Sequence, residues 1–496
     1  RSGGRVVPGR RIAFLALAAL LGATACRKTP PLSLEVLVPV LPPSLDPFSD
    51  SRLVSRSIFT SIYEPLVEES AFGMRPAVAE SWTNPSPDTW VFRIAAGARF
   101  HDGAPVTSRD VVEAVLSSRT ATGSVASLAD LKTIEATDER TVRMRTQRPA
   151  GDFLLAVSAL FVPRRADGTF LGTGPYRVVA RTPDRLILRK ASRPGHPEPL
   201  LEEVVFRRTT SAAEGLRLMR RPVPVAVLDP TPEMIAEARR DPRFRVAVAE
   251  SGGLAYLAVG FAAGAGPLED VRVRRALRLS LDLPALVRAG TLAGGTPVAR
   301  VVPPGSFGFD PKLVAVRRDL DEARRLLALA GYPNGFEATL DVNPVGRSAA
   351  EAVASQAAEA GIRLEVVVHP QDEFVALVNG RSPLYLYRWF VGMDAGQALR
   401  NAFHTKVPAR GLGSMNRTGY SSRAVDAAFA RLAAAPMQEK RLRCLREISD
   451  LLDADLPWIP LFSEREPRIL PAWLDLPRRP DGLFVLTEAR KAGPGR

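Results

Sequence analysis

The side chains that could ligate a metal ion or act as a general base are sparse in this sequence. Metal sites usually draw their ligands from closely spaced motifs. The histidines instead stand far apart along the 496 residues, at His101, His196, His369 and His404. We therefore predict no metal site and no cofactor.

Short motifs of the common catalytic classes are also missing. The sequence has no Gly-x-x-x-x-Gly-Lys phosphate loop, Gly-x-Ser-x-Gly elbow, His-Glu-x-x-His helix or Cys-x-x-Cys pair. Gly172-Thr173-Gly174 is half of a dinucleotide fingerprint, but Pro175 removes an amide donor, so we interpret the segment as a turn before a strand. A serine, an aspartate and a histidine that meet only in the folded chain remain possible. We predict no catalytic residues.

Any functional side chains must be positioned by strands and helices that alternate along the chain. Residues 336–342 and 362–368 alternate between apolar and polar side chains, and residues 349–360 between them have a helical pattern. A strand, helix and strand of this length predict parallel pairing through a right-handed crossover. Asp319 and Thr107 are each expected to cap a helix. The sequence predicts the α/β class.

Length and charge restrict the kind of protein further. A chain of 496 residues, 46% hydrophobic and 24% charged, is expected to form two or three packed regions. The formal net charge is +14, but the cations are scattered among acids and form no basic stripe. We therefore predict no nucleic-acid partner.

The first residues predict export from the cytoplasm. Arg5, Arg10 and Arg11 precede an apolar run at 12–21, and small residues at 23–25 lead to Cys26. This order is typical of a secretory signal, here residues 1–25, and the run is too short to span a membrane. Cys26 stands where a lipoprotein signal places its lipidated cysteine. Simple cleavage near residue 25 is the alternative.

Several short blocks follow one another in an order that is similar to that of a known family. The most diagnostic are 90–94 (Trp-Val-Phe-Arg-Ile) and 100–107 (Phe-His-Asp-Gly-Ala-Pro-Val-Thr). Others stand at 45–47, 62–67, 172–177, 330–336, 419–422 and 457–461. Together they resemble the family 5 extracellular solute-binding proteins, which are the oligopeptide, dipeptide and nickel type receptors of ABC importers. The likeness covers nearly all of residues 33–465.

This resemblance implies a two-lobed clamshell like the periplasmic binding proteins, with an extra subdomain in the first lobe. Hinge closure would bury the ligand between the lobes. The chain is expected to cross between lobes near 257–261 and 460–464. The predicted boundaries are 1–25 for the signal peptide, 26–47, 172–257 and 465–496 for the core of lobe I, 48–171 for its extra subdomain, and 258–464 for lobe II.

The resemblance also implies where the ligand binds. In the family, one cleft wall includes a strand that ends in Trp, followed by an acid that pairs with a peptide's amino terminus. Here Asp394 is the nearest acid after the strand, but its spacing from the Trp differs from the family pattern, because Gly392 takes the amine-binding position. The alternative role of Asp394 is that of a loop cap. The predicted ligand-binding residues are Ser51, Leu53, Arg388, Trp389, Phe390, Asp394 and Phe462.

The predicted function is that of a non-enzymatic receptor of an ABC importer. It would be a monomer, lipid-anchored in the periplasm or at the cell surface, and would pass a peptide-like or other small polar solute to the permease subunits. The aromatic content is only 7%, and the family's Tyr-Trp pair is missing around 189–195, which weakens a general oligopeptide role. A degenerate member that acts as a sensor or interaction protein stays open, as does a secreted serine hydrolase.

Overall fold

The computed structural model describes residues 3, 32–70, 73–121, 128, 130–147, 150, 153–166, 168–193, 197–392, 394–435, 438–477, 479 and 481–493. The predicted signal peptide apart from Gly3, the predicted lipidation site Cys26 and His196 lie outside these residues. Among the described residues, no helix combines the length and the apolar character needed to cross a membrane.

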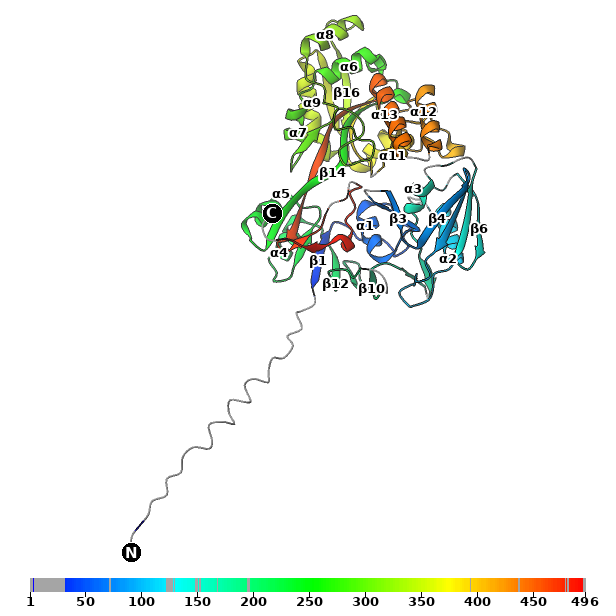
Figure 1. The fold of residues 1–496 in the computed structure, drawn as a ribbon. Helices are drawn as coiled ribbons and strands as arrows, with labels where there is room; N and C mark the ends of the chain where they lie inside the picture. The colour runs from blue at the N-terminus through cyan, green and yellow to red at the C-terminus, as the bar shows by residue number, and fades with distance from the viewer. Residues whose placement is uncertain are drawn as a thin grey trace.

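One eleven-stranded sheet runs through the molecule (Figure 1). The strand order is β10 (Tyr176–Arg181), β11 (Arg185–Lys190), β12 (Glu203–Arg208), β1 (Ser33–Val38), β13 (Val225–Val227), β19 (Trp458–Pro471), β14 (Phe244–Val259), β18 (Leu384–Phe390), β16 (Phe336–Val342) and β17 (Ile362–Val368), with β15 (Gly295–Pro297) beside β19. Strands β16 and β17 are parallel and enclose helix α9 (Arg347–Ala358) in sequence, which confirms the predicted crossover. The fold class is α/β, as predicted.

Two long antiparallel strands connect the two halves of the molecule. Strands β14 and β19 span 16 and 14 residues, and Figure 1 shows them running from the lower half to the upper half. Their pairing is interrupted between Glu250 and Leu254, where Gly252 has a positive φ of 65°. An irregular ladder bends more easily than a regular one. The ladder that connects the halves is therefore locally disrupted at this point.

Helices pack around both halves. In the half that contains β1 lie α1 (Leu53–Ile62), α4 (Ala212–Met219) and α5 (Pro232–Arg240). The other half contains α6 (Val271–Leu279), α7 (Leu283–Gly290), α8 (Leu320–Leu329), α9, α10 (Gln371–Leu377), α11 (Ala395–Phe403), α12 (Arg423–Ala434) and α13 (Gln438–Asp455). Asp319 accepts a hydrogen bond from the amide of Glu322 at the start of α8, so this predicted cap is confirmed.

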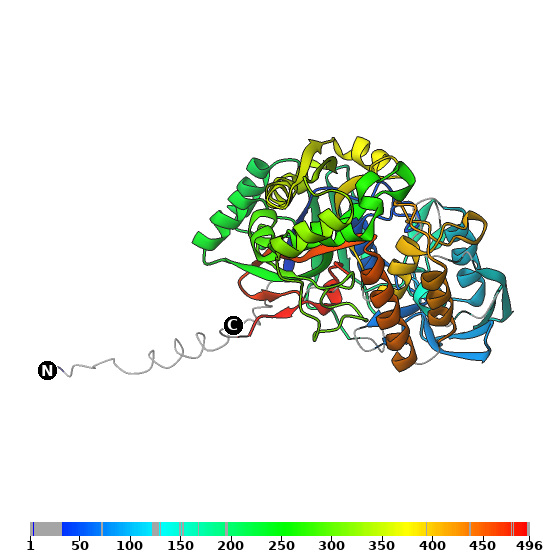
Figure 2. The ribbon, with the colours of Figure 1, turned by 90° about the horizontal axis from the view of Figure 1, so that it is seen from above.

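A second sheet has a hydrophobic core of its own. Strands β4 (Ala79–Ser86), β5 (Thr89–Ile94), β7 (Thr141–Thr146) and β6 (Leu131–Asp138) pair in that order, and α2 (Ser108–Thr120) contacts β6 and β7. Figure 2 shows this sheet at one side of the large one. Thr107 and Asp110 form the predicted capping box of α2. The separate core falls within the predicted extra subdomain, whose boundaries stay a prediction.

Short elements complete the fold. They are α3 (Phe153–Ser158) and three hairpins: β2 (Val67–Ser70) with β3 (Gly73–Pro76), β8 (Arg164–Ala166) with β9 (Thr169–Leu171), and β20 (Leu474–Asp475) with β21 (Arg490–Lys491).

The glycines before β10 pack directly against the end of α1. The amide of Gly174 donates to the carbonyl oxygen of Ile62, and a Cβ atom on Gly172 would lie 1.8 Å from that oxygen. His101 Nε2 lies 3.0 Å from the Gly174 carbonyl oxygen. Two sequence blocks that resemble the family thus meet here, and the Gly172-Thr173-Gly174 segment is the structural turn that the sequence indicates.

Candidate ligand-binding cavity

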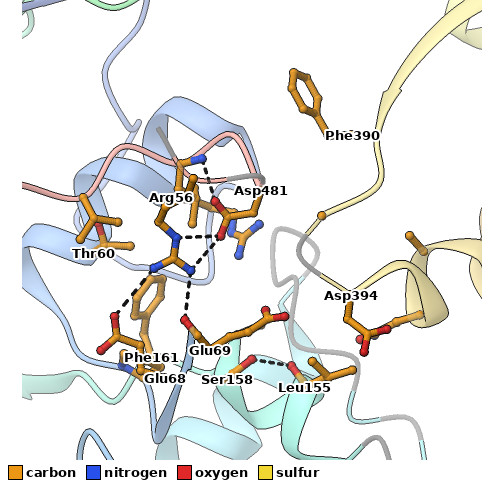
Figure 3. Close-up of a pocket in the computed structure, with 18 of the residues that line it drawn as sticks. Arg56, Thr60, Glu68, Glu69, Leu155, Ser158, Phe161, Phe390, Asp394 and Asp481 are labelled. Carbon is orange, nitrogen blue, oxygen red and sulfur yellow. Dashed lines mark hydrogen bonds and ion pairs between the residues drawn. The ribbon is translucent and has the colours of Figure 1, made fainter. Parts of the chain in front are cut away.

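A cavity of about 450 Å³ lies between two walls that come from distant parts of the chain (Figure 3). One wall consists of α1, residues 63–69, α3, and the C-terminal residues 479 and 481–487. The other consists of residues 389–392, residues 394–401 and Met415. A volume of this size is typical of sites for small molecules.

Four aromatic side chains are among the residues that line the cavity. Trp389 and Phe390 stand at the end of β18, while Tyr63 and Phe161 lie on the opposite wall. Phe390 is 38% exposed, so much of its ring is free to contact a solute. Trp389 is held edge to face against the buried Trp458, with ring centroids 5.4 Å apart. The wall therefore combines a fixed ring with an accessible one.

Asp394 lines the cavity, but its carboxylate already forms a hydrogen bond and an ion pair within the protein. One oxygen accepts a hydrogen bond of 2.7 Å from the amide of Gly396, and Asp394 is thereby the N-cap of α11. The other oxygen lies 2.8 Å from the guanidinium of Arg441, and both side chains are only 12% exposed. The structure thus shows the capping role that the sequence left as an alternative. Contact with a ligand stays a prediction.

The other charged groups of the cavity are mostly paired with each other. Glu64 pairs with Arg193. Arg479 lies 2.9 Å from Asp481 and also donates to the backbone carbonyl oxygen of Glu69. The hydrogen bond from Arg479 to Glu69 joins the C-terminal segment to β2.

Arg56 and Glu69 behave differently from these paired groups. Arg56 Nε is buried and has no hydrogen-bond partner, and burial lowers the pKa of Arg56. Burial, together with the nearby Asp394 and Asp481, raises the pKa of Glu69 to about 7, against the opposing effect of Arg479 and Arg56. Both side chains line the cavity, on the wall opposite Phe390 (Figure 3).

Of the predicted ligand-binding residues, Trp389, Phe390 and Asp394 line the cavity and the other four do not. Ser51 is exposed before α1, and Leu53 is the first residue of that helix. Arg388 lies 3.0 Å from Glu464 and donates to the carbonyl oxygen of Gly290.

Phe462 is fully buried in the hydrophobic core of the second half. Ligand contact by Phe462 would require the core to open. Ligand contact by Ser51, Leu53 or Arg388 would require movement towards the cavity.

Apart from Asp394, sequence reasoning missed the charged residues of the cavity. Arg479 and Asp481 lie beyond residue 465, where the family resemblance ends, and Arg56 and Glu69 lie in no motif. Only Glu64 belonged to a recognised block. Nothing in a single sequence indicates that these side chains converge.

A serine, an aspartate and a histidine do meet elsewhere, at the ends of β16 and β17. Asp341 accepts a hydrogen bond of 2.6 Å from Ser382 and lies 2.8 Å from His369 Nε2. A catalytic triad needs the histidine between the serine and the acid, so that it can take the serine proton. Here the acid stands between the other two. Within the described ranges, no three His, Cys, Asp or Glu side chains form a group that could hold a metal ion.

Comparisons with known proteins agree with this architecture. Heme-binding protein A of Haemophilus influenzae is 22% identical over 82% of this chain and 83% of its own. The glutathione-binding protein GsiB of Escherichia coli is 23% identical over 83% and 85%. The solved structure of HbpA2 from Haemophilus parasuis superposes with a TM-score of 0.80 at 22% identity, covering 93% of this chain and all of that one.

A family profile gives the assignment. The profile described as "Bacterial extracellular solute-binding proteins, family 5 Middle" matches residues 73–409, which is more than half of the chain. The two halves, the extra sheet and the cavity between the walls are the features that the family resemblance implied. The chain belongs to the bacterial extracellular solute-binding proteins of family 5.

Proposed function

We propose that this protein is the substrate-binding receptor of an ABC importer. It captures a small polar or peptide-like solute in the cavity and delivers it to membrane permease subunits. The observation that carries the proposal is the cavity itself, because its two walls come from halves connected by β14 and β19. Bending at the irregular ladder near Glu250 would bring the walls together around a solute.

The proposed receptor acts by binding alone. Ligand binding stabilises the closed arrangement and raises the melting temperature by mass action. The described residues around the cavity supply charges, hydrogen-bonding groups and aromatic rings. The relatives are named for heme and for glutathione, and one scaffold can serve chemically different solutes. The family alone therefore does not define the solute of this chain.

The test of the proposal is to identify what the protein carries. The mature chain is purified under native conditions, and the compounds released on denaturation are identified by mass spectrometry. Each compound is then titrated into ligand-free protein. We expect at least one released or supplied small solute to bind reversibly and to raise the melting temperature. A protein that neither carries nor binds any small solute would contradict the receptor function.

We further propose that the receptor is a monomer anchored by a lipid on Cys26, in the periplasm or at the cell surface. Labelling with a fatty-acid analogue in the producing cells tests the anchor. The wild type should be labelled and recovered with membranes, whereas Cys26→Ala should be unlabelled and released. An unlabelled wild type would favour simple cleavage of the signal.

A hydrolase is not favoured by any observation. Asp341 lies between Ser382 and His369, so the histidine is not placed to take the proton of this serine. A fluorophosphonate serine probe should therefore leave the protein unlabelled. The sensor alternative rested on scarce aromatic residues, but four aromatic side chains line the cavity, namely Tyr63, Phe161, Trp389 and Phe390.

A further inference from the structure

Arginines gather at one end of the half that contains β1, where two helices finish. Helix α4 ends at Met219 and α5 ends at Arg240, and each carries cations in its last turn and shortly after it. The six arginines at these helix ends are exposed, and we call them the arginine patch: Arg217, Arg220, Arg221, Arg239, Arg240 and Arg243.

The arginine patch lies at the edge of the large sheet where β1 begins. Strand β13 is parallel to β1, and β13 and β14 are both antiparallel to β19, so β1, β13 and β14 all start at this edge. Arg243 directly precedes β14, and its guanidinium donates to the carbonyl oxygens of Met219 and Arg221 at the end of α4. Figure 1 shows α4, α5 and β1 together in the lower half of the molecule.

Few acids neutralise the arginine patch. Three of its members have a carboxylate beside them, namely Arg220 with Glu237, Arg243 with Asp241 and Arg221 with the buried Glu35. Glu35 also pairs with Arg207, so it does not serve Arg221 alone. Within the described part of the chain, Arg217, Arg239 and Arg240 make no ion pair. The patch therefore keeps an excess of positive charge.

The C-terminal hairpin adds two exposed cations, Arg490 and Lys491, which form β21. Arg490 shares the carboxylate of Asp475 with Arg245, the second residue of β14, so the hairpin reaches the edge where β14 starts. Cations often stand at the C-terminal ends of helices, where they stabilise the helix dipole. Arg490 and Lys491 follow no such helix end, so helix stabilisation does not explain their position.

The fold gathers charges that are separated in the sequence. The sequence shows no basic stripe, because these cations come from three distant segments, 217–221, 239–243 and 490–491. Clusters of roughly four to eight basic side chains are typical of surfaces that bind anionic phospholipids. The arginine patch and β21 together match this pattern.

The predicted lipid anchor would hold the same edge near a membrane. Cys26 stands seven residues before Ser33, the first residue of β1. A fully extended chain of that length spans at most about 25 Å. Exposed charges attract an oppositely charged surface over roughly one Debye length, about 8 Å. A lipid on Cys26 would therefore keep the arginine patch close enough to the bilayer to bind it.

We propose that the arginine patch and β21 form a membrane-docking surface that binds anionic phospholipid headgroups, so that the half containing β1 lies on the bilayer. The inference goes beyond the receptor function, and it rests on the proposed anchor only for the tether. Strand β14 starts at this edge and leads to the second half (Figure 1). The second half would therefore face away from the membrane and stay free to close over a solute.

The experiment uses the mature chain made without acylation, so that only the surface of the protein can bind. Vesicles of phosphatidylcholine alone are compared with vesicles that also contain phosphatidylglycerol or cardiolipin, at low and at high ionic strength. Cosedimentation measures the partition coefficient. We expect binding to the anionic vesicles and none to the neutral ones. High salt should release the protein, because it screens exposed charges.

The patch variant combines Arg217→Gln, Arg239→Gln and Arg240→Gln, which break no ion pair. Its control has the same net charge and removes three exposed arginines of the second half, also without an ion pair among the described residues, by Arg288→Gln, Arg317→Gln and Arg347→Gln. Each basic side chain near an anionic bilayer contributes roughly fivefold to binding, so the patch variant should lose at least about tenfold and the control less than about threefold.

Two further variants sharpen the result. Lysine at the same three patch positions should bind as the wild type does, because attraction to the bilayer depends on charge and not on the shape of the guanidinium. The double change Arg490→Gln with Lys491→Gln should also weaken binding to anionic vesicles. It decides the outcome if the patch variant does not fold.

Four results would overturn the inference. They are no binding to anionic vesicles, equal binding to neutral and anionic vesicles, equal losses in the patch variant and its control, and binding of heparin without binding of vesicles, which would indicate a soluble polyanion as the partner. Solute binding is measured on the same variants and should not change, because these residues lie outside the cavity lining. Failure of membrane docking therefore leaves the receptor function standing, and failure of solute binding leaves the docking result standing.

Discussion

Replacing Asp394 tests whether this acid stabilises helix α11 or binds the ligand. In the family's peptide receptors an acid in this region holds the amino terminus of the ligand, whereas here the carboxylate caps α11 and pairs with Arg441. If the cap and the ion pair are its main roles, Asp394→Ala should cost folding stability first. Loss of ligand affinity should be secondary.

The expected cost follows from the two contacts. Loss of an N-cap side chain destabilises by about 1 kcal/mol. Removal of one partner from a buried ion pair costs roughly 3 to 5 kcal/mol, and we take the lower end because Asp394 and Arg441 each keep 12% exposure. Asp394→Ala should therefore lower the free energy of unfolding by about 4 kcal/mol. Asp394→Asn keeps a good capping group, so its loss should be about 3 kcal/mol.

Urea unfolding measures these losses, and the fluorescence of Trp389 and Trp458 reports on this half of the molecule. The double variant of Asp394 and Arg441 should lose less than the sum of the two single variants, by roughly 1 kcal/mol or more. The matched control is Glu447→Ala, which breaks an exposed ion pair between α12 and α13 and should cost less than about 1 kcal/mol.

The result that would refute this reasoning is a stable Asp394→Ala variant. If this variant keeps the unfolding free energy of the wild type and no longer binds the ligand, the Asp394 carboxylate acts in ligand binding and not in stabilising the fold.

Three other perturbations have defined outcomes. Gly172→Ala should lose about 3 kcal/mol of stability in urea unfolding, because its Cβ atom would meet the last carbonyl oxygen of α1. The control is Gly97→Ala, whose Cβ atom would meet open space, and it should change stability by less than about 1 kcal/mol. Equal losses in the two variants would contradict the close packing at Gly172. Burial raises the pKa of Glu464 to about 7, so the folded state binds more protons than the unfolded state between pH 4.5 and 7. The share of Glu464 in the fall of stability as pH rises through this window should be up to about 3 kcal/mol. Glu464→Gln should remove that share and leave the share of Glu69, whose pKa is also about 7; a curve that Glu464→Gln does not change would show that Glu464 is not one of the titrating groups. Phe390→Ala should weaken binding of the solute about tenfold without lowering the melting temperature of the ligand-free protein. The control is Leu329→Ala, which changes an exposed residue of α8 and should alter neither the affinity nor the melting temperature. A lower melting temperature of ligand-free Phe390→Ala would show that this ring stabilises the fold.

Local sequence patterns predicted much of the fold because they depend on near neighbours. Apolar alternation located β16 and β17, and side-chain oxygens at Asp319 and Thr107 located two helix starts. The aromatic end of β18 was also predicted, since Trp389 and Phe390 follow a recognisable strand. These features need only the residues within a few positions.

The charged part of the site could not be predicted in this way. Arg56 lies on α1 and Asp481 near the end of the chain, and only the folded molecule brings them to one cavity. Phe462 shows a second limit. Its strand was expected, but the face on which its ring lies depends on the register of β19 against β14, which shifts next to Ala255. A shift of one residue exchanges the two faces of a strand.

The central pair of strands has a consequence for how the protein is made. Strand β14 is synthesised near the middle of the chain, and its partner β19 emerges only after the whole second half. Long-range pairing of this kind forms slowly. Until β19 arrives, β14 has an open edge that other chains can join, and such edges promote aggregation. A nascent chain cut short before Trp458 should therefore depend on chaperones far more than the complete one.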